Sequence, residues 1–462
     1  MSGFVAAVDL GATSGRVMIG QVGHNELILR PVARFPNDPL TLADGLHWDI
    51  DSLYKHSLDG LAAALREESS IVSVGIDSWA VDYALIGVDG RMLAAPFHYR
   101  DNRAAAGVEA VHALVDPVDL YGSNGLQFLL FNTLYQLAAE PRLAEANSLL
   151  LVPDLISYWL TGRKVAERTN ASTTGLLSVA TGEWDAGLID RIGLQRSLFP
   201  ELVDPGTMLG TLTSEVAARV GGTLSVTAVG SHDTASAVVA VPASSDDFAY
   251  VSCGTWGLVG VELDRPVLTE ASRLANFTNE GGVDGRVRYL RNVMGLWLLS
   301  ESVRMWKLDL VKLVHAASEW TTPVSVFDAN DPSFLAPGDM PARIAAWCAD
   351  HGLAAPKTPV EFVRSIIESL AVAFADAVRT SAELSGKTVA VIHIVGGGSR
   401  NALLCQLTAD RAGVPVLAGP VEATAIGNVL VQARTLGLAS GSLESLRSLV
   451  AATFSPVRYS PR

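Results

Sequence analysis

The stretch FVAAVDLGATSGRVMIGQVG, residues 4–23, decides how this chain begins to fold. Two apolar runs, FVAAVDL and GRVMIGQVG, flank a turn of glycine and hydroxyl residues, DLGATSGR at positions 9–16. Apolar runs on both sides of a short glycine turn predict a β-hairpin. We therefore expect the chain to start with two paired strands joined by a tight, polar turn.

A second stretch, AYVSCGTWGLVGVE at residues 249–262, has the same form of apolar run, glycine turn and apolar run. The cluster VPASSDD at residues 241–247 precedes it and is typical of a linker. A second half that opens like the first predicts two related domains, which we place at residues 1–243 and 244–462. Ligands of such folds are expected in the crevice between the domains.

The segments between these openings alternate in type. Residues 53–68 have helical periodicity, residues 71–87 are typical of strands, and residues 108–115 and 131–140 are again helical. This alternation predicts an α/β fold, a sheet covered by helices.

The composition indicates a well-packed globular protein, because 49% of the 462 residues are hydrophobic and 18% are charged. The net charge of −14 argues against nucleic acid and anionic membranes as partners. It leaves room for an anionic small ligand, since backbone N–H groups can hold phosphate inside an acidic protein.

The cysteines and the apolar segments predict a cytoplasmic location. Cys253, Cys348 and Cys405 are widely spaced and have no metal-site or disulfide pattern, which favours a reducing compartment. The first residues lack the basic start of a signal peptide. The longest apolar run is interrupted by Pro153 and Asp154, so we expect no membrane span.

The turn DLGATSGR is the first candidate site. Its glycines permit unusual backbone angles, and its hydroxyls stand beside exposed N–H groups. Arg16 has a fork of donors suited to phosphate, and Asp9 could hold Mg²⁺ directly or through water. The alternative is a plain β-hairpin with a salt bridge.

GGGSRN at residues 396–401 is the second candidate, and it lies between an apolar run at 389–395 and a helical segment. Glycines in this position let a ligand approach the backbone and point helix N–H groups at it. The alternative is that the glycines only make room for a helix against the sheet. The chain has no GxxxxGK[ST] and no GxGxxG after a strand, so neither a Walker-type NTPase nor a Rossmann dehydrogenase is supported.

The third candidate is His232-Asp233-Thr234, which stands between the apolar runs 223–229 and 237–242. We expect Asp233 to be buried, and a buried charge is costly unless it is paired or used. It is either a general base that takes a hydroxyl proton during phosphoryl transfer or the cap of a helix that begins at Thr234. A histidine such as His232 is, by itself, more often structural than catalytic.

Other polar residues occur in apolar settings that suit a carbohydrate, which is held by amide and carboxylate hydrogen bonds and an aromatic wall. The sequence offers such groups at Asp77, Trp79, Asp82, Asn276, Asn279, Glu280 and Asn292. Taken singly, Trp79, Trp256 and Trp297 are interpreted as core residues.

Taken together and in this order, the motifs resemble the FGGY family of carbohydrate kinases, from Val5 to about Gln432. The resemblance implies two α/β domains of the actin and hexokinase-like (ribonuclease H-like) fold with an active-site cleft between them. DLGATSGR is similar to the family's first phosphate hairpin, GTW at 254–256 to the second, and GGGSRN to the turn on the adenosine side. Within the family, GIDSWAVDY, SHDTASAV and HIVGGGSRN are most similar to the rhamnulokinase branch.

This resemblance implies a cytoplasmic enzyme, a monomer or homodimer, that uses ATP and Mg²⁺ to phosphorylate O1 of a ketose, above all L-rhamnulose. Asp233 would be the general base and Asp9 the metal ligand. The sugar-side residues implied are Ala80 (through its backbone), His232, Thr234 and Asn292, with Asp77 and Trp79 beside them. The nucleotide-side residues implied are Ala12, Thr13, Ser14, Gly15, Arg16, Thr255, Gly397, Gly398 and Asn401.

Two positions depart from the pattern of this branch: Ala80 stands where glycine is common, and Ser300 where a glutamine is usual. Two alternatives stay open at this stage. One is an FGGY kinase for another deoxy or L-sugar, such as L-fuculose or L-ribulose. The other is a non-catalytic nucleotide- or sugar-binding protein on the same fold.

Overall fold

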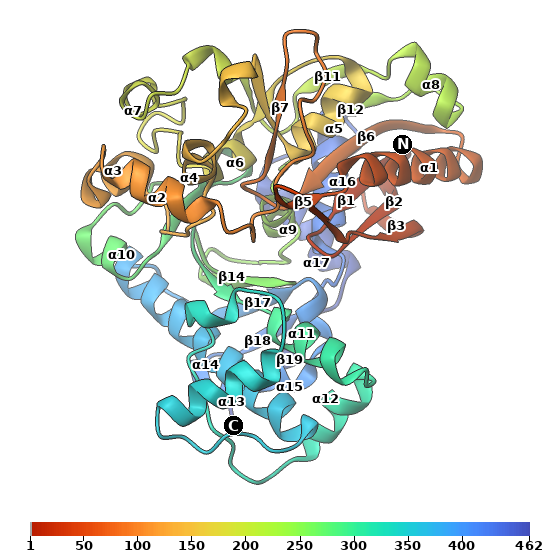
Figure 1. Cartoon of the computed structure of the whole chain (residues 1–462). Coiled ribbons are helices and arrows are strands. Elements are labelled where there is room, and N and C mark those ends of the chain that lie inside the picture. Colours follow the sequence, from red (N-terminus) through yellow and green to blue (C-terminus); the bar gives the residue numbers. More distant parts are fainter. Residues whose placement is uncertain (1) are drawn as a thin grey trace. The chain divides into compact units, whose positions relative to one another are not determined.

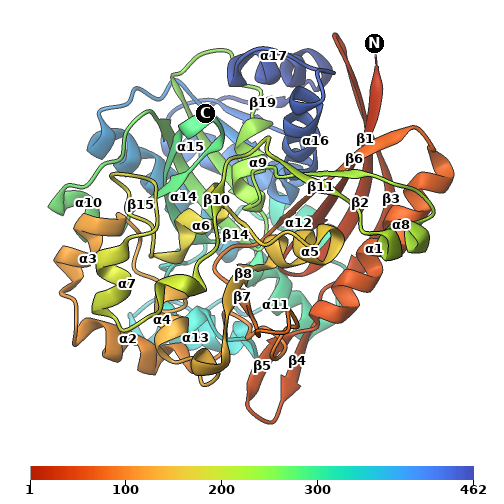
Figure 2. The ribbon, with the colours of Figure 1, turned by 90° about the horizontal axis from the view of Figure 1, so that it is seen from above.

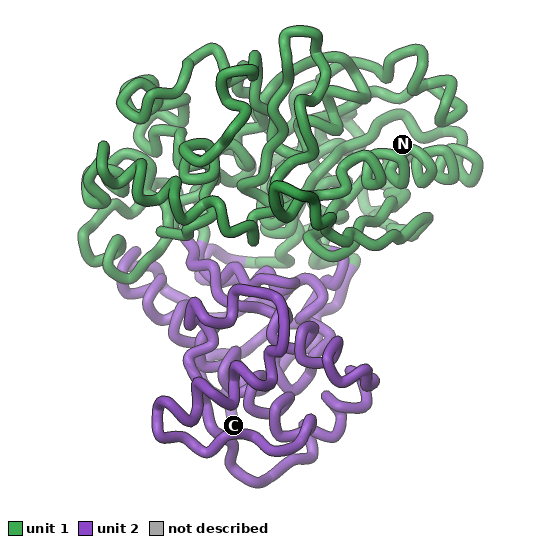
Figure 3. The backbone as a smooth tube through the Cα atoms, viewed as in Figure 1, with its two compact units in different colours: residues 1–244, 262–289, 423–453 green, residues 245–261, 290–422, 454–462 purple. Residues whose placement is uncertain are grey.

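The computed structural model describes residues 2–462 (Figure 1). It is a mixed α/β structure that divides into two compact units (Figure 3). Unit 1 holds the chain up to Ser244 together with residues 262–289 and 423–453, and unit 2 holds residues 245–261, 290–422 and 454–462. The sequence prediction placed one domain boundary between residues 243 and 244, whereas the chain crosses between these units several times.

Unit 1 is built on a six-stranded sheet in the order β11-β12-β6-β1-β2-β3. β1 pairs in parallel with β6, which in turn pairs in parallel with β12. The carboxyl ends of these three strands therefore lie at one edge of the sheet. The strands are β1 (Gly3–Leu10), β2 (Ser14–Gly23), β3 (Glu26–Pro36), β6 (Ile71–Ser78), β11 (Met208–Thr211) and β12 (Ser225–Thr227).

Three two-stranded sheets and many helices complete unit 1. The short strands are β4 (Pro39–Leu42), β5 (Gly45–Trp48), β7 (Tyr83–Ile86), β8 (Ser148–Leu151), β9 (Ala166–Glu167) and β10 (Leu202–Val203); β15 (Thr278–Gly281) also lies in this unit. The helices are α1 (Ile50–Glu67), α2 (Ala104–His112), α3 (Pro117–Asn124), α4 (Thr133–Ala138), α5 (Val152–Thr161), α6 (Arg168–Ala171), α7 (Ala186–Arg191), α8 (Ser214–Val220), α9 (Asp233–Val239), α10 (Glu270–Leu274), α16 (Ala423–Thr435) and α17 (Leu443–Thr453).

The predicted N-terminal hairpin is confirmed. β1 and β2 pair antiparallel from Gly3 to Leu10, with Leu10 opposite Gly15. The turn is closed by the Gly11 N–H, which donates to the Ser14 carbonyl at 3.0 Å. The apolar run of β1 forms because both faces of this central strand are covered, and Val5, Ala6, Ala7, Val8 and Leu10 are fully buried.

Helices α1 and α16 cover opposite faces of this sheet, and Figure 2 shows the strands between them. A side chain at Gly60 of α1 would meet Val17, and one at Gly20 would meet Val429 of α16. Because side chains alternate along a strand, positions 17 and 20 of β2 face opposite sides. α1 confirms the helix predicted at 53–68, while the two helices predicted at 108–115 and 131–140 are observed as α2 and the shorter α4.

Helix α16 is attached to the N-terminal sheet by buried amides as well as by apolar contacts. Gln432 Nε2 donates to the Ala6 carbonyl at 2.9 Å, and Asn428 Nδ2 donates to the Gly75 carbonyl at 3.1 Å. Both side chains are fully buried. A segment more than 340 residues away in sequence thus completes the core of unit 1.

Unit 2 contains most of a seven-stranded sheet in the order β15-β16-β14-β13-β17-β18-β19. β13 pairs antiparallel with β14, which confirms the second predicted hairpin, and it pairs in parallel with β17. The strands are β13 (Phe248–Cys253), β14 (Trp256–Leu263), β16 (Val287–Met294), β17 (Val391–Val395), β18 (Val416–Ala418) and β19 (Val457–Tyr459). The helices are α11 (Trp297–Trp306), α12 (Leu310–Glu319), α13 (Met340–Asp350), α14 (Pro359–Ser385) and α15 (Ala402–Ala412).

The three cysteines are free and buried. Within residues 2–462, no helix combines the length and the apolar character that crossing a membrane would require.

Candidate functional site

Three aspartates gather at the carboxyl edge of the unit 1 sheet. Asp9 near the end of β1 lies opposite Asp77 of β6. Asp233 is the first residue of α9, which follows β12. The loop before α9 joins the end of β6, because the Ser78 N–H donates to the Ser231 carbonyl at 2.9 Å. Parallel pairing therefore brings together three carboxylates that are far apart in the sequence.

Asp9 and Asp77 are both buried but differ in their partners. Arg16 Nε lies 2.9 Å from Asp9 Oδ2. This is the salt bridge expected if the turn is a plain β-hairpin. Asp77 accepts a hydrogen bond from Asn428 Nδ2. Burial raises the pKa of the Asp77 carboxyl well above its usual range, and the Asp9 and Asp233 charges raise it further against the Asn428 hydrogen bond. Asp77 therefore favours its protonated form.

Asp233 is less buried than the sequence predicted. Its side chain is 30% exposed, whereas His232 and Thr234 on either side are buried. Asp233 is the first residue of α9, and at this position its carboxylate is partly exposed. Its Oδ1 accepts from the Thr234 hydroxyl at 3.1 Å. The capping alternative is corrected, because the helix begins at Asp233 itself and its N-cap is His232, which makes no side-chain cap bond.

The loop after β6 contains a strained turn at the position singled out for sugar binding. The Asp82 N–H donates to the Ala80 carbonyl at 2.9 Å, which closes a three-residue turn around Val81. Val81 has a φ of 68°, an unusual conformation for a β-branched residue. Such backbone costs about 1–3 kcal/mol and persists only where the surroundings hold it in place. Ala80 at this turn is partly exposed.

Asp82 provides that support. Its buried carboxylate accepts four hydrogen bonds, from Trp48 Nε1 at 2.6 Å, Trp79 Nε1 at 3.0 Å, Tyr99 N–H at 3.2 Å and Gln136 Nε2 at 2.9 Å. Burial raises the pKa of Asp82 to about 6 in spite of these bonds. The two indoles pack on each other with ring centroids 4.1 Å apart. Trp79 is therefore a buried, fixed wall behind the Ala80 turn.

Unit 2 holds four of the residues predicted on the nucleotide side, Thr255, Gly397, Gly398 and Asn401. Thr255 forms the turn between β13 and β14, and its carbonyl accepts from the Trp297 N–H at 3.1 Å. The same turn accepts from the Leu296 N–H through the Gly254 carbonyl at 2.9 Å. A Cβ on Gly254 would meet no atom within 4 Å, so this backbone faces open space. The turn is thus fixed by its hydrogen bonds to residues 296 and 297, and Gly254 has open space beside its Cα.

The glycine turn after β17 has two different kinds of glycine. Gly396 has a φ of 81°, which only glycine adopts readily. A Cβ on Gly398 would lie 2.2 Å from Cys253 Sγ, so this residue packs closely against β13. A Cβ on Gly397 would have no neighbour nearer than 4.0 Å. Gly396 and Gly398 therefore serve the fold, as the packing alternative predicted, while the space beside Gly397 leaves the ligand interpretation a prediction.

The remaining predicted residues of unit 2 are placed around these turns. Asn401 is the N-cap of α15, and its side chain accepts from the Leu404 N–H at 3.1 Å. Asn292 lies on β16 and is partly buried. Trp256 and Trp297 are also partly buried, and Ser300 is exposed on α11.

The aspartates of unit 1 have the chemistry for Mg²⁺, although they do not form a complete protein cage. Among residues 2–462, no group of three or more histidine, cysteine or acidic side chains could hold a metal by itself. Mg²⁺ is usually bound by one or two carboxylates together with substrate phosphates and water. Asp9 therefore fits the ion as one carboxylate of such a ligand set.

Three charged residues lie around Ser231 and His232, and sequence interpretation assigned none of them to this place. Glu280 of β15 and Arg288 of β16 contact the His232 ring, and Glu167 accepts from the Ser231 N–H at 2.9 Å. Glu280 was noted only as a polar residue in an apolar setting, and the other two gave no local signal. Their separation from His232 in the sequence explains why, since only the fold brings them together.

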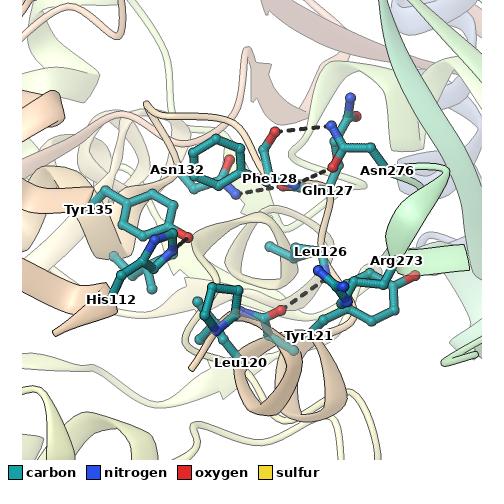
Figure 4. Close-up of a pocket in the computed structure, with 13 residues that line it drawn as sticks. His112, Leu120, Tyr121, Leu126, Gln127, Phe128, Asn132, Tyr135, Arg273 and Asn276 are labelled. Atoms are coloured by element: carbon teal, nitrogen blue, oxygen red, sulfur yellow. Dashed lines mark hydrogen bonds between the residues drawn. The ribbon is translucent and has the colours of Figure 1, made fainter. Parts of the chain in front are cut away.

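Unit 1 also has a cavity of about 300 Å³. It is lined by aromatic rings of Tyr121, Phe128 and Tyr135, with Arg273 and Asn276 at its side (Figure 4). Asn276 holds Phe128 by accepting from its N–H at 2.7 Å and donating to its carbonyl at 3.2 Å. Asn276, which the sequence offered as a candidate group for a carbohydrate, lines this cavity, whereas the residues predicted for the base, the metal and the nucleotide do not.

The sequence of the whole chain has known relatives. Residues 4–240 match the N-terminal domain and residues 249–436 the C-terminal domain of the FGGY family of carbohydrate kinases. A rhamnulokinase of Bacteroides thetaiotaomicron is 41% identical over 463 residues, covering 99% of this chain and 95% of that protein. A rhamnulokinase of Pectobacterium carotovorum is 42% identical over 469 residues, covering 99% of this chain and 93% of that protein.

Solved structures agree on the fold. A xylulose kinase from Lactobacillus acidophilus superposes with a TM-score of 0.80 at 15% identity, covering 100% of this chain and 94% of that one. A Plasmodium falciparum glycerol kinase, crystallised with ADP, gives 0.78 at 14% identity with the same coverage. This chain has the two-domain, actin and hexokinase-like fold of sugar kinases, and with the family match over nearly its whole length it belongs to the FGGY family of carbohydrate kinases.

Proposed function

We propose that this carbohydrate kinase transfers the γ-phosphate of ATP to O1 of a ketose, and that the ketose is L-rhamnulose. The observation that carries the proposal is Asp233, a partly exposed carboxylate beside Asp9 and Asp77 at the edge of the unit 1 sheet. The choice of sugar is supported by two relatives named rhamnulokinase, which are 41% and 42% identical to this chain and cover 99% of it.

In the proposed reaction, Asp233 acts as the general base. One oxygen of its carboxylate accepts the proton of the O1 hydroxyl as the bond from O1 to the γ-phosphorus forms. The bond from that phosphorus to the β,γ-bridging oxygen breaks, and ADP leaves with the electron pair. No covalent intermediate on the protein is needed.

The strained turn at residues 80–82 is proposed to bind the sugar. The Ala80 backbone is partly exposed there, with the fixed ring of Trp79 behind it. His232, Thr234, Asp77 and Asn292 would supply the remaining sugar contacts. Pre-formed backbone and locked side chains favour this role, because a substrate then loses little binding energy to ordering the protein.

The two hairpins and the glycine turn are proposed to bind the nucleotide. Residues 12–16 supply the N–H groups of the first hairpin, and Arg16 would share its guanidinium between Asp9 and phosphate. In unit 2, the open faces of the Thr255 turn and of Gly397 allow close approach, with Gly398 and Asn401 shaping the turn. Mg²⁺ bound at Asp9 would neutralise charge on the β- and γ-phosphates.

A coupled assay of ADP release with Mg·ATP tests this function. The ketoses are L-rhamnulose, L-fuculose, L-ribulose and D-xylulose, with glycerol as a further acceptor, and phosphorus NMR of the product identifies the phosphorylated oxygen. A strong preference for L-rhamnulose with the phosphate on O1 is expected. Preference for another ketose would keep the kinase and reject the sugar, and a phosphate on another oxygen would reject the placement of the base.

A further inference from the structure

A buried ion pair lies directly behind His232. Arg288 is fully buried and Glu280 nearly so, and Arg288 Nη1 lies 3.0 Å from Glu280 Oε2. Burial alone would raise the pKa of Glu280, but the Arg288 charge and the His232 contact hold it below its usual value. A buried pair of this kind contributes little net stability, because the cost of removing both charges from water offsets their attraction. The role of this ion pair is therefore inferred from the residues that it contacts.

The pair holds the inner edge of the His232 ring. Nδ1 lies 3.1 Å from Arg288 Nη2 and 3.3 Å from Glu280 Oε2. Arg288 is itself fixed, since its Nε donates to the Gly281 carbonyl at 2.8 Å. The backbone of His232 is held as well, because its N–H faces Thr169 Oγ1 at 3.4 Å. Neither the ring nor its anchors can turn freely.

Two side chains compete for Nδ1 of the ring. Arginine has only donors, so Nδ1 accepts from Arg288 when the neutral ring has its proton on Nε2, whereas a proton on Nδ1 would be donated to Glu280. The tautomer that pairs with Arg288 and the charged ring both carry a proton on the outer nitrogen, Nε2. That nitrogen lies 3.5 Å from Asp233 Oδ1. Catalytic contacts of this length are common before substrate binds and shorten in the complex.

Asp233 therefore has two unlike oxygens. Oδ1 accepts from the Thr234 hydroxyl at 3.1 Å and lies 3.5 Å from His232 Nε2. No donor from residues 2–462 is seen on Oδ2. We propose that Glu280 and Arg288 are positioning residues that act through His232, whose Nε2–H holds Oδ1 of Asp233 so that Oδ2 takes the ketose proton. This inference rests on the proposed role of Asp233 as the base.

Arg288→Lys tests the proposal, because lysine keeps a positive charge for Glu280 but cannot also serve Nδ1 and the Gly281 carbonyl. We expect kcat to fall about 10- to 100-fold, as for other groups that orient an active-site side chain. KM for the ketose and the Kd of Mg·ATP should stay within about threefold, because Arg288 is buried and touches neither substrate. Arg447→Lys is the matched control, since Arg447 is also buried and lies 2.7 Å from Glu262.

A pair of His232 variants covers the case in which Arg288→Lys does not fold. Glutamine can place an amide N–H near the position of Nε2, whereas asparagine is too short to reach Asp233. We expect His232→Gln to retain a kcat at least about tenfold higher than His232→Asn, with equal Mg·ATP affinity in both. Equal kcat in the two variants, or a kcat of Arg288→Lys no lower than that of Arg447→Lys, would overturn the proposal.

A measurement that does not need turnover separates this proposal from the proposed function. Nitrogen-15 NMR of the nine histidine rings, with His232→Asn to assign the signal, reports which nitrogen is protonated. We expect a proton on Nε2 of His232 in the free protein and partial loss of this state in Arg288→Lys. A neutral ring with its proton on Nδ1 would overturn the positioning role even in an active kinase, whereas inactivity toward every ketose would count against the proposed function alone.

Discussion

Replacing Gly398 by alanine is expected to destabilise unit 2, whereas the same change at Gly397 is not. The new Cβ at position 398 would lie 2.2 Å from Cys253 Sγ and 2.5 Å from its Cβ, while at position 397 the nearest atom is 4.0 Å away. Neither glycine has a φ in the left-handed region, so the two variants differ in space and not in backbone strain. They form a matched pair within one turn.

The size of the effect follows from the overlap. Forcing extra volume into a packed site costs about 1–3 kcal/mol, because β13 or the turn must shift. For a domain of this size each kcal/mol lowers Tm by about 2–4 °C. Gly397→Ala is expected to leave stability unchanged or raise it by up to about 1 kcal/mol, since alanine restricts the unfolded chain. If position 397 faces the nucleotide, its methyl group should also weaken Mg·ATP binding.

Thermal unfolding followed by circular dichroism, together with calorimetric titration of Mg·ATP, measures both effects. Adding Cys253→Ala to Gly398→Ala removes the sulfur and should recover part of the lost stability. A Gly398→Ala protein that melts at the wild-type temperature would refute the packing argument. Unchanged Mg·ATP affinity in a folded Gly397→Ala protein would remove this glycine from the nucleotide site.

Three further predictions address unit 1. Asp233→Asn should lower kcat about 10²–10⁴-fold with Mg·ATP affinity preserved, and near-normal turnover in the ADP-release assay would reject the base. Arg16→Ala removes the partner of buried Asp9, so it should lower the free energy of unfolding by about 1–3 kcal/mol and weaken Mg·ATP binding; unchanged affinity in the titration would exclude a phosphate role. Burial raises the pKa of Asp82 from 3.8 in the unfolded chain to about 6 in the folded protein. The protonated carboxyl therefore adds about 3 kcal/mol to the free energy of unfolding below about pH 4, and this contribution is lost as the pH rises through about 6. Urea unfolding from pH 4.5 to 7.5 should show this slope in the wild type and not in Asp82→Asn, and parallel pH profiles of the two proteins would contradict it.

The two hairpins, the α/β class and the first long helix were predictable because their signals are local. An apolar run, a glycine turn and a second apolar run specify β1 and β2 through backbone sterics alone. The motif order then indicated the family, and through it the aspartate that follows β12. The contact between Asp9 and Arg16 was also predictable, because the register of the hairpin places these two residues opposite each other.

Other features had no local signal. Ala80 and Val81 occur in a run typical of strands, yet Val81 adopts a positive φ beside Asp82, which is held by four donors, three of them from other segments. The exposure of Asp233 could not be read from its apolar neighbours, because burial depends on what packs over a residue in three dimensions. Sequence periodicity carries no information on either point.

The sequence by itself indicated the two hairpins, the α/β class and the family, and through the family the aspartate that we propose as the base. The tertiary structure alone decided that α16 completes the first sheet and that Glu280 and Arg288 stand behind His232. The physical reason is the distance along the sequence over which each interaction acts. Backbone preference and hydrophobic period act over a few residues, whereas a buried charge is tolerated only where the folded chain supplies its partner.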